Sequence, residues 1–205
     1  MNYATLVSNI ENFTEDNSSE LSASVDQIIA QAETMIFQRL PNLPCFRATA
    51  TGNLVVDTFN YTIASARMIR NVSITSSNVV SYLDHRVDSY LRDYWPNSTT
   101  TGVPIMYSTK SASTSGTVIT LAPTPSAILA YAVDYTAPEA GLSSSNTTTW
   151  VGDNAETVLL ASCLYETSAF LKDANTLTLY KQQFDEAIQL FQQEMLRDYT
   201  AEYNG

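Results

Sequence analysis

The fold of this chain is decided in its last quarter, where residues 154–173 read NAETVLLASCLYETSAFLKD. Apolar side chains occupy almost every side of the helix that this stretch predicts between Val158 and Leu164. A helix that is apolar all round is buried on most of its faces. The stretch therefore predicts the central helix of a bundle, capped at its start by Asp153 or Asn154.

A second helical pattern follows after a short link. From Asn175 to Tyr199, apolar residues recur every three or four positions, which is the spacing of one face of a helix. Asn175 is a good N-cap for this helix. Because the link at residues 173–175 is short, the two helices are expected to form an antiparallel hairpin or a bent rod.

The first part of the chain predicts two further helices, over residues 3–13 and 22–40, and Pro41 and Pro44 stop the second. Helices at both ends and strands between them argue for an α+β fold. We expect a helical bundle built from both chain ends, with a small antiparallel β lobe inserted in the middle. The expected parts are N-terminal helices over 1–45, a β-rich lobe over 46–152, and long C-terminal helices with a docking tail over 153–205.

The β-rich lobe is rich in Val, Ile, Thr and Tyr, with Gly and Pro between the runs. A hairpin is expected around Thr51-Gly52, between segments 47–50 and 53–57. One short helix is expected over 84–94, and a polar loop over 138–152. The remaining expected strands are 66–75, 104–109, 117–122 and 127–136.

Composition limits the function. The net charge of −11 argues against a broad surface that grips nucleic acid, which needs clustered Lys and Arg. No run approaches the roughly 18 apolar residues that span a bilayer, so we expect no membrane contact. The start of the chain lacks the pattern of a signal peptide, so we expect the protein to be made in the cytoplasm and to stay in the cell or to enter a particle assembled there.

Catalytic signatures are missing from the sequence. His85 is the only histidine, and Cys45 and Cys163 are far apart, so metal-ligand spacing is absent and both thiols are expected to be free. Pairs such as Asp84 with Asp88 are expected in an acidic protein without any acid–base role. We therefore predict no catalytic residue, no metal site and no cofactor.

An aromatic run offers the clearest candidate for a contact site. Tyr90, Arg92, Tyr94 and Trp95 lie within six positions of one another. Amphipathic aromatic residues with an arginine are typical of protein contact surfaces. Packing of the short helix onto the sheet explains the same residues equally well, and the sequence leaves both interpretations open.

Four segments together resemble the head-to-tail adaptor proteins of tailed bacteriophages, also called head completion or connector proteins, and among them the tail tubular protein A type. Their order and spacing along the chain carry the resemblance, since each alone is only a packing or turn motif. They are FTEDNS at 13–18 with the helix ending Arg39-Leu40-Pro41, SYLRDYWPN at 89–97 before Gly102-Val103-Pro104, LAPTPS at 121–126 before VDY at 133–135, and residues 146–150 with the helix over 159–173.

The resemblance implies a structural part of the virion at the head–tail junction, and no enzyme. Such adaptors form a ring, usually of twelve copies, between the portal protein and the next tail tube or nozzle protein. DNA passes through the ring without specific binding. The resemblance loosely assigns portal binding to Arg197, Asp198, Tyr199 and Tyr203, and contact with the tail or a neighbouring subunit to Tyr90, Arg92, Tyr94 and Trp95.

Three other interpretations remain from the sequence. The chain is alternatively another structural virion component, such as a tail completion or minor capsid protein. It is otherwise a binding module with the β lobe as ligand surface, or a hydrolase with paired carboxylates that include Glu166 or Asp84. Location in the particle, a bound small molecule and a measurable activity distinguish them.

Overall fold

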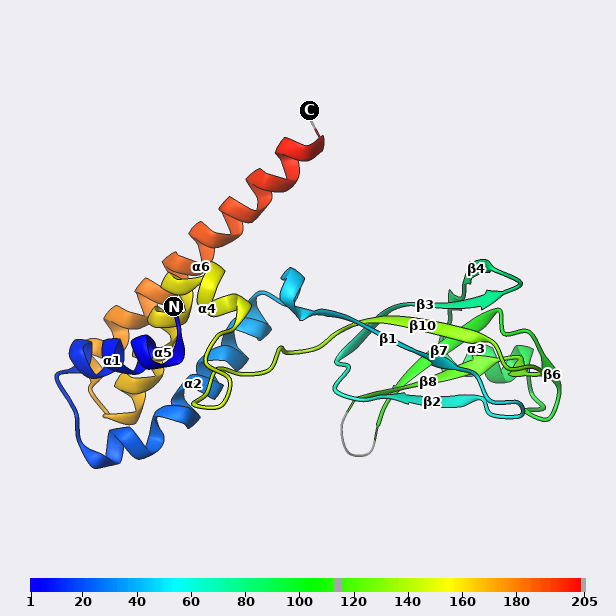
Figure 1. Cartoon of the computed structure of the whole chain (residues 1–205), viewed down its shortest axis with the longest axis horizontal. Helices are drawn as coiled ribbons and strands as arrows, with labels where there is room; N and C mark the ends of the chain where they lie inside the picture. The colour runs from blue at the N-terminus through cyan, green and yellow to red at the C-terminus, as the bar shows by residue number, and fades with distance from the viewer. Residues whose placement is uncertain (113–115, 204–205) are drawn as a thin grey trace. The chain divides into compact units, whose positions relative to one another are not determined.

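The computed structural model describes the backbone of residues 1–112 and 116–203, and side chains in these ranges up to residue 196. The chain divides into two compact units (Figure 1). Unit 1 comprises Met1–Pro41 and Pro138–Gly205, and unit 2 comprises Asn42–Ala137. Helices and antiparallel sheets are both present, so the predicted α+β class is confirmed. The loop after Ala137 belongs to unit 1, whereas the sequence had grouped it with the β lobe.

Unit 1 is helical, and α5 is its centre. Eight of the fifteen residues of α5 are buried, on every side of the helix, as the sequence predicts. Helices α1, α2, α4 and α6 all contact α5. The helices described in unit 1 are α1 (Tyr3–Thr14), α2 (Ser19–Arg39), α4 (Trp150–Asn154), α5 (Glu156–Phe170) and α6 (Ala174–Tyr203).

Small polar residues let the neighbouring helices approach α5 closely. The hydroxyl of Ser162 is fully buried and donates to the carbonyl oxygen of Ala32 on α2, at 3.1 Å. Thr167 and Ser168 each donate to a carbonyl oxygen four residues earlier in α5. Each buried hydroxyl therefore has a partner, and the central helix has no unpaired hydroxyl at these three positions.

The helix caps differ from the sequence predictions. Ala155 is the N-cap of α5 and makes no side-chain cap, because the unpredicted short helix α4 ends just before it. Asp173, not Asn175, caps α6 by accepting a bond from the backbone N–H of Asn175 at 3.0 Å. Lys172 lies beyond the end of α5, at a positive φ of 58°. The sequence placed capping groups near the right junctions but on the wrong residues.

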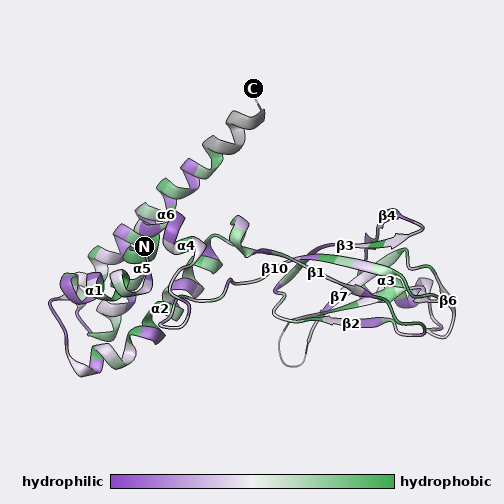
Figure 2. Ribbon diagram, in the orientation of Figure 1, coloured by the Kyte–Doolittle hydropathy of each residue, from purple (hydrophilic) through white to green (hydrophobic). Residues whose placement is uncertain are grey.

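Helix α6 is much longer than the helix it packs against. Its 30 residues span about 45 Å, against about 22 Å for the 15 residues of α5. Apolar and polar segments alternate along it in Figure 2, and among the side chains described, up to residue 196, the last buried one is Phe191. Its last part extends past the other helices of unit 1 (Figure 1). The prediction that this helix stops at Tyr199 is wrong, because it continues to Tyr203.

Unit 2 contains two four-stranded sheets and one short ladder. The strand orders are β1-β10-β3-β4, β2-β8-β7-β5 and β6-β9. The first sheet is antiparallel throughout, and β5–β7 and β6–β9 are the parallel pairs. The bounds are β1 (Arg47–Asn53), β2 (Asn60–Ile63), β3 (Met68–Ser76), β4 (Val79–Tyr82), β5 (Asp84–His85), β6 (Thr101–Gly102), β7 (Met106–Ser111), β8 (Thr117–Ala122), β9 (Thr124–Pro125) and β10 (Ala130–Thr136), with α3 (Asp88–Tyr94) and the 3-10 turn η1 (Pro44–Phe46).

The core of unit 2 joins residues from both four-stranded sheets. Val72 and Val133 come from the first sheet, and Ile119 and Leu121 from the second. These side chains are at most 3% exposed. Burial of such aliphatic side chains contributes on the order of 1.5–3 kcal/mol each to folding. This shared core holds the two sheets together.

Three sequence predictions in the β lobe need correction. The Thr51-Gly52 hairpin is wrong, because residues 47–53 form one continuous strand that pairs with β10. The helix predicted over 84–94 begins only at Asp88, since residues 84–85 pair with β7. Strand β4 was not predicted at all. In the first two cases a partner strand far away in the sequence decides the conformation. Strand β4 instead pairs with β3 across the two-residue turn at Ser77-Asn78.

Candidate functional surfaces

Helix α3 carries an exposed stack of aromatic rings. The rings of Tyr90 and Tyr94 are parallel within 4°, with centroids 6.1 Å apart, as expected one helical turn apart. The guanidinium carbon of Arg86 lies 5.6 Å from the centroid of the Tyr90 ring. Trp95 continues the series, 6.2 Å from Tyr94. The two tyrosines are about half exposed, so the stack presents flat apolar area together with a positive charge.

The other face of α3 packs against strands β7 and β8 of the same unit. Leu91 is buried with Met106 and Ala122, and Trp95 is partly buried against them. The indole N–H of Trp95 donates to the carbonyl oxygen of Thr100 at 2.9 Å. The predicted aromatic run therefore divides into a packed part, Trp95 with its neighbour Leu91, and an exposed part, the tyrosines.

A cavity of about 340 Å³ lies beside α3 within unit 2. Its wall includes Leu91 and Trp95, together with Arg92, Lys110 and Asp88. Arg92 Nε donates to Asp88 Oδ2 at 2.7 Å and lowers the pKa of that carboxyl, with a smaller contribution from Ser108. The charges at this cavity are thus largely paired, which suits a contact surface better than a site for a charged ligand.

The candidate acid–base groups are dispersed. Arg86 pairs with Asp84 at 3.4 Å, while Asp88 pairs with Arg92. His85 Nε2 lies 3.4 Å from the hydroxyl of Thr109, and its ring packs 5.0 Å from that of Tyr107. Within the described ranges, no group of three or more His, Cys, Asp or Glu residues is placed to hold a metal ion. Cys45 and Cys163 are not joined in a disulfide, and burial raises the pKa of the Cys163 thiol strongly.

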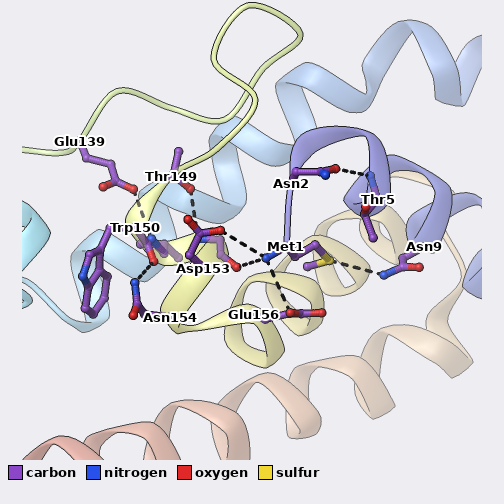
Figure 3. Close-up of polar contacts among 12 residues, drawn as sticks. Met1, Asn2, Thr5, Asn9, Glu139, Thr149, Trp150, Asp153, Asn154 and Glu156 are labelled. Carbon is purple, nitrogen blue, oxygen red and sulfur yellow. Dashed lines mark hydrogen bonds and ion pairs between the residues drawn. The ribbon is translucent and has the colours of Figure 1, made fainter.

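The start of the chain meets the junction of α4 and α5 in unit 1 (Figure 3). The amino group of Met1 donates to the carbonyl oxygen of Gly152 and lies 3.6 Å from carboxylate oxygens of both Asp153 and Glu156. Thr149 caps α4 by accepting from the N–H of Gly152 at 3.1 Å. A Cβ atom at Gly152 would lie 2.6 Å from the carbonyl oxygen of Met1. Only glycine allows this close approach of the two backbones.

Glu33 on α2 is the most perturbed carboxyl of unit 1. Its side chain accepts from the backbone N–H of Leu142, with oxygen distances of 2.9 and 3.2 Å. Burial raises its pKa from 4.5 to about 7, the bond from Leu142 opposes the shift, and nearby Glu139 adds to it. Glu33 therefore ties the loop at Leu142 to α2 while it resists ionisation.

The residues predicted to bind the portal lie at the far end of α6. Arg197, Asp198, Tyr199 and Tyr203 belong to its helical backbone, and their side chains lie outside the described residues. Their assignment stays a prediction. The structure adds that the backbone of this segment is helical to Tyr203, whereas the sequence predicted a docking tail after a helix that ends at Tyr199.

The charge of the protein is divided unequally between the units. Unit 1 contains 16 acidic and four basic residues, and unit 2 contains five acidic and six basic residues. With histidine neutral, unit 1 thus carries a net charge of −12 and unit 2 a net charge of +1. The acidic character that the whole sequence shows belongs entirely to the helical unit.

One surface feature was missed by sequence reasoning. Strand β4 exposes Val79, Val80 and Tyr82, which are between 55% and 69% exposed. The signal for it was Ser77-Asn78, which adopts φ values of 50° and 62° and forms the tight turn from β3. Asn at such a position is typical of a two-residue hairpin. A four-residue strand is too short for its pattern alone to be recognised.

These features define a structural protein whose surfaces suit contact with other proteins. A family model described as "SU10 adaptor protein" matches residues 1–204, so the chain belongs to the SU10 adaptor family. It is therefore a phage adaptor-type protein, and the family implies interaction with other structural proteins of the phage. No curated protein matches the sequence. No helix in the described part of the chain is both long and apolar enough to cross a membrane.

Proposed function

We propose that this protein is a ring-forming head-to-tail adaptor that joins the portal to the tail and forms part of the DNA channel. The observation that carries the proposal is the match of the adaptor family model over residues 1–204. In this proposal the helices of unit 1 act as one bundle, about twelve copies of which line the channel at the head–tail junction. The tail tubular protein A type is the particular form of adaptor proposed.

The distribution of charge supports the placement of unit 1 around the DNA. A ring of subunits that each carry a net charge of −12 in this unit creates a strong negative potential. Phosphate groups are repelled by such a wall, so that DNA slides past without binding. Replacement of exposed acidic residues of unit 1 by lysine is expected to slow DNA ejection, and unchanged ejection would contradict this part of the proposal.

The length of α6 supports a role for its end in docking. About half of the helix extends past α5, and no buried residue is described after Phe191. A helix this long without a partner leaves its surface open for a binding protein. We assign the segment with Arg197, Asp198, Tyr199 and Tyr203 to the portal, and the α3 stack of Tyr90 and Tyr94 to the tail protein or a neighbouring subunit.

The decisive measurement is native mass, for the adaptor alone and after mixing with the portal ring of the same phage. A closed set of adaptor copies on the portal is the expected result. A chain truncated after Leu196 is expected to lose this binding while it retains its fold by circular dichroism. Absence of any association in the full-length protein would overturn the portal role and favour another structural position in the particle.

A further inference from the structure

Strand β4 is an edge strand whose apolar side chains Val79, Val80 and Tyr82 are exposed. Its partner β3 lies on one side, and no described strand of unit 2 pairs with the other side. Val79 is on the same face as the buried Ile74, because Ser81 is the direct cross-strand partner of Ile74 and side chains alternate along a strand. Val79 is nevertheless 63% exposed, so the core stops short of β4.

Of the features that protect edge strands from pairing, β4 has only its short length of four residues. Natural edges carry charges, proline or bulges that discourage a further strand. The sequence of β4 is Val-Val-Ser-Tyr, and its register with β3 is regular over four pairs. The tight turn at Ser77-Asn78 fixes the hairpin in advance. Little conformational entropy remains to be lost when a strand adds here.

The opposite edge of the same sheet is also open. Strand β1 pairs with β10 on one side and with no described strand on the other. The four strands alternate in direction from β1 to β4. Rotation of a second copy about an axis along the strands preserves their direction. Its β1 would then meet β4 in the antiparallel sense and continue the alternation across the joint.

We propose that β4 of one copy pairs antiparallel with β1 of a second copy, so that the first sheet of unit 2 runs on from subunit to subunit. The contact joins two different surfaces, which is the kind of contact that generates rings. This pairing rests on the proposed ring of adaptors and would supply the contact between neighbouring subunits.

Charge favours unit 2 as the place of this contact. Copies of unit 1 repel one another at −12 each, whereas copies of unit 2 carry only +1. Strand β4 is uncharged, so no charge is desolvated when it pairs. A four-residue strand offers less than the roughly 1,200–2,000 Å² of a stable pairwise interface. The contact is therefore weak in isolated pairs and is completed by closure of the ring.

Chemical cross-linking between two differently marked copies tests the pairing. One full-length variant carries Val80→Cys on β4 and the other Asn53→Cys on β1; both positions are exposed and lie in the same cross-strand row of the sheet. The two variants are mixed and treated with a short bis-maleimide, alone at high protein concentration and together with the portal ring. Wild-type protein controls for reaction of Cys45 and Cys163.

The expected result is a cross-linked dimer of one variant with the other, absent when either variant is used alone. A ring of correct native mass on the portal without this dimer would overturn the strand pairing and leave the adaptor function intact. A mixed dimer in the free protein without portal binding would support the pairing and contradict the portal role. A dimer of the Val80→Cys variant with itself would also overturn the proposal.

A second pair of variants checks the result without cross-linking. The double variant Val80→Lys with Tyr82→Lys places two charges on the edge. It is expected to raise the protein concentration needed for ring formation at least tenfold. Val103→Lys, at a half-exposed position outside this sheet, is the matched control and should assemble normally. Normal assembly of the double lysine variant would overturn the proposal.

Discussion

The two units of this protein achieve their stability and their surface character in opposite ways. Unit 1 surrounds a central helix, α5, which has buried residues on every side, with four other helices, and it carries the whole negative charge. Unit 2 packs two sheets face to face, is almost neutral, and leaves an apolar strand edge and an aromatic stack exposed. Unit 1 repels other copies of itself and other anionic surfaces, whereas unit 2 has surfaces suited to contact with proteins.

This difference separates two requirements that conflict in a single surface. A strong negative potential keeps DNA moving but also drives identical subunits apart. In the ring that we propose, location of the negative charge in unit 1 and of the contact surfaces in the nearly neutral unit 2 would meet both requirements in one chain. Variants that change one unit at a time test whether the two units differ in this way.

The largest effect is expected from Leu159→Ala in α5. Leu159 is fully buried, and truncation of such a side chain costs about 2–5 kcal/mol in the free energy of unfolding. Hydrogen exchange should report lost protection in α2, α5 and α6, with β8 and β10 unchanged. Ile119→Ala, at a fully buried position of β8, should give the converse pattern. Loss of protection in both units from either variant would mean that the two units unfold together.

Gly152→Ala should destabilise unit 1 by about 1–3 kcal/mol, as overpacking does. The added Cβ meets the backbone carbonyl of Met1 at 2.6 Å, and backbone cannot move aside cheaply. Gly52→Ala in unit 2 is the matched control, because its closest atom, at 2.9 Å, is the hydroxyl of the Tyr131 side chain, which can shift. Chemical denaturation of both variants measures the difference, and equal costs would contradict this explanation.

The pH dependence of unit 1 should follow Glu33. Its folded pKa of about 7 exceeds 4.5, so its stabilising contribution is complete below about pH 4.5 and is lost as the pH rises to about 7. Because the side chain is only partly buried, the loss is discounted for solvent screening to about 1–2 kcal/mol. Glu33→Gln keeps an acceptor for Leu142 and should raise stability at pH 8.

Thermal unfolding of Glu33→Gln between pH 4.5 and 8 checks this expectation. The variant should flatten the decline that the wild type shows over this range. Glu20→Gln, at an exposed position on the same helix, is the control and should leave the slope unchanged. A slope as steep in Glu33→Gln as in the wild type would assign the pH dependence to other groups.

The smallest effect is expected in unit 2, with the opposite sign. Arg92 lowers the pKa of Asp88, so this pair stabilises above pH 3.8 and loses its contribution as the pH falls through the lower, folded pKa. Asp88→Asn should cost only a few tenths of a kcal/mol at pH 7, the usual value of an exposed pair one helical turn apart. Acid titration followed by hydrogen exchange in α3 measures it. An Asp88→Asn variant that is more stable in acid than the wild type would contradict this prediction.

Long apolar patterns made the helices predictable. The stripe of α2 and the all-round apolar surface of α5 depend on many residues, so each pattern survives local exceptions. The strands β7, β8 and β10 were recognised for a similar reason. By contrast, Thr51-Gly52 has the local chemistry of a turn, yet pairing of the whole segment with β10 holds it extended. Strand β4 and α4 are too short to carry a pattern of their own.

Residue pattern and count were enough to predict the α+β class, the order of the longer helices and of strands β3, β7, β8 and β10, and the net charge. The tertiary structure alone decided that the charge lies in one unit, that Tyr90 and Tyr94 are exposed while Leu91 is buried, and that β1 and β4 are open edges of one sheet. Exposure and strand pairing are set by contacts between residues far apart in the chain. A local sequence pattern therefore does not show which strand lies at the edge of a sheet.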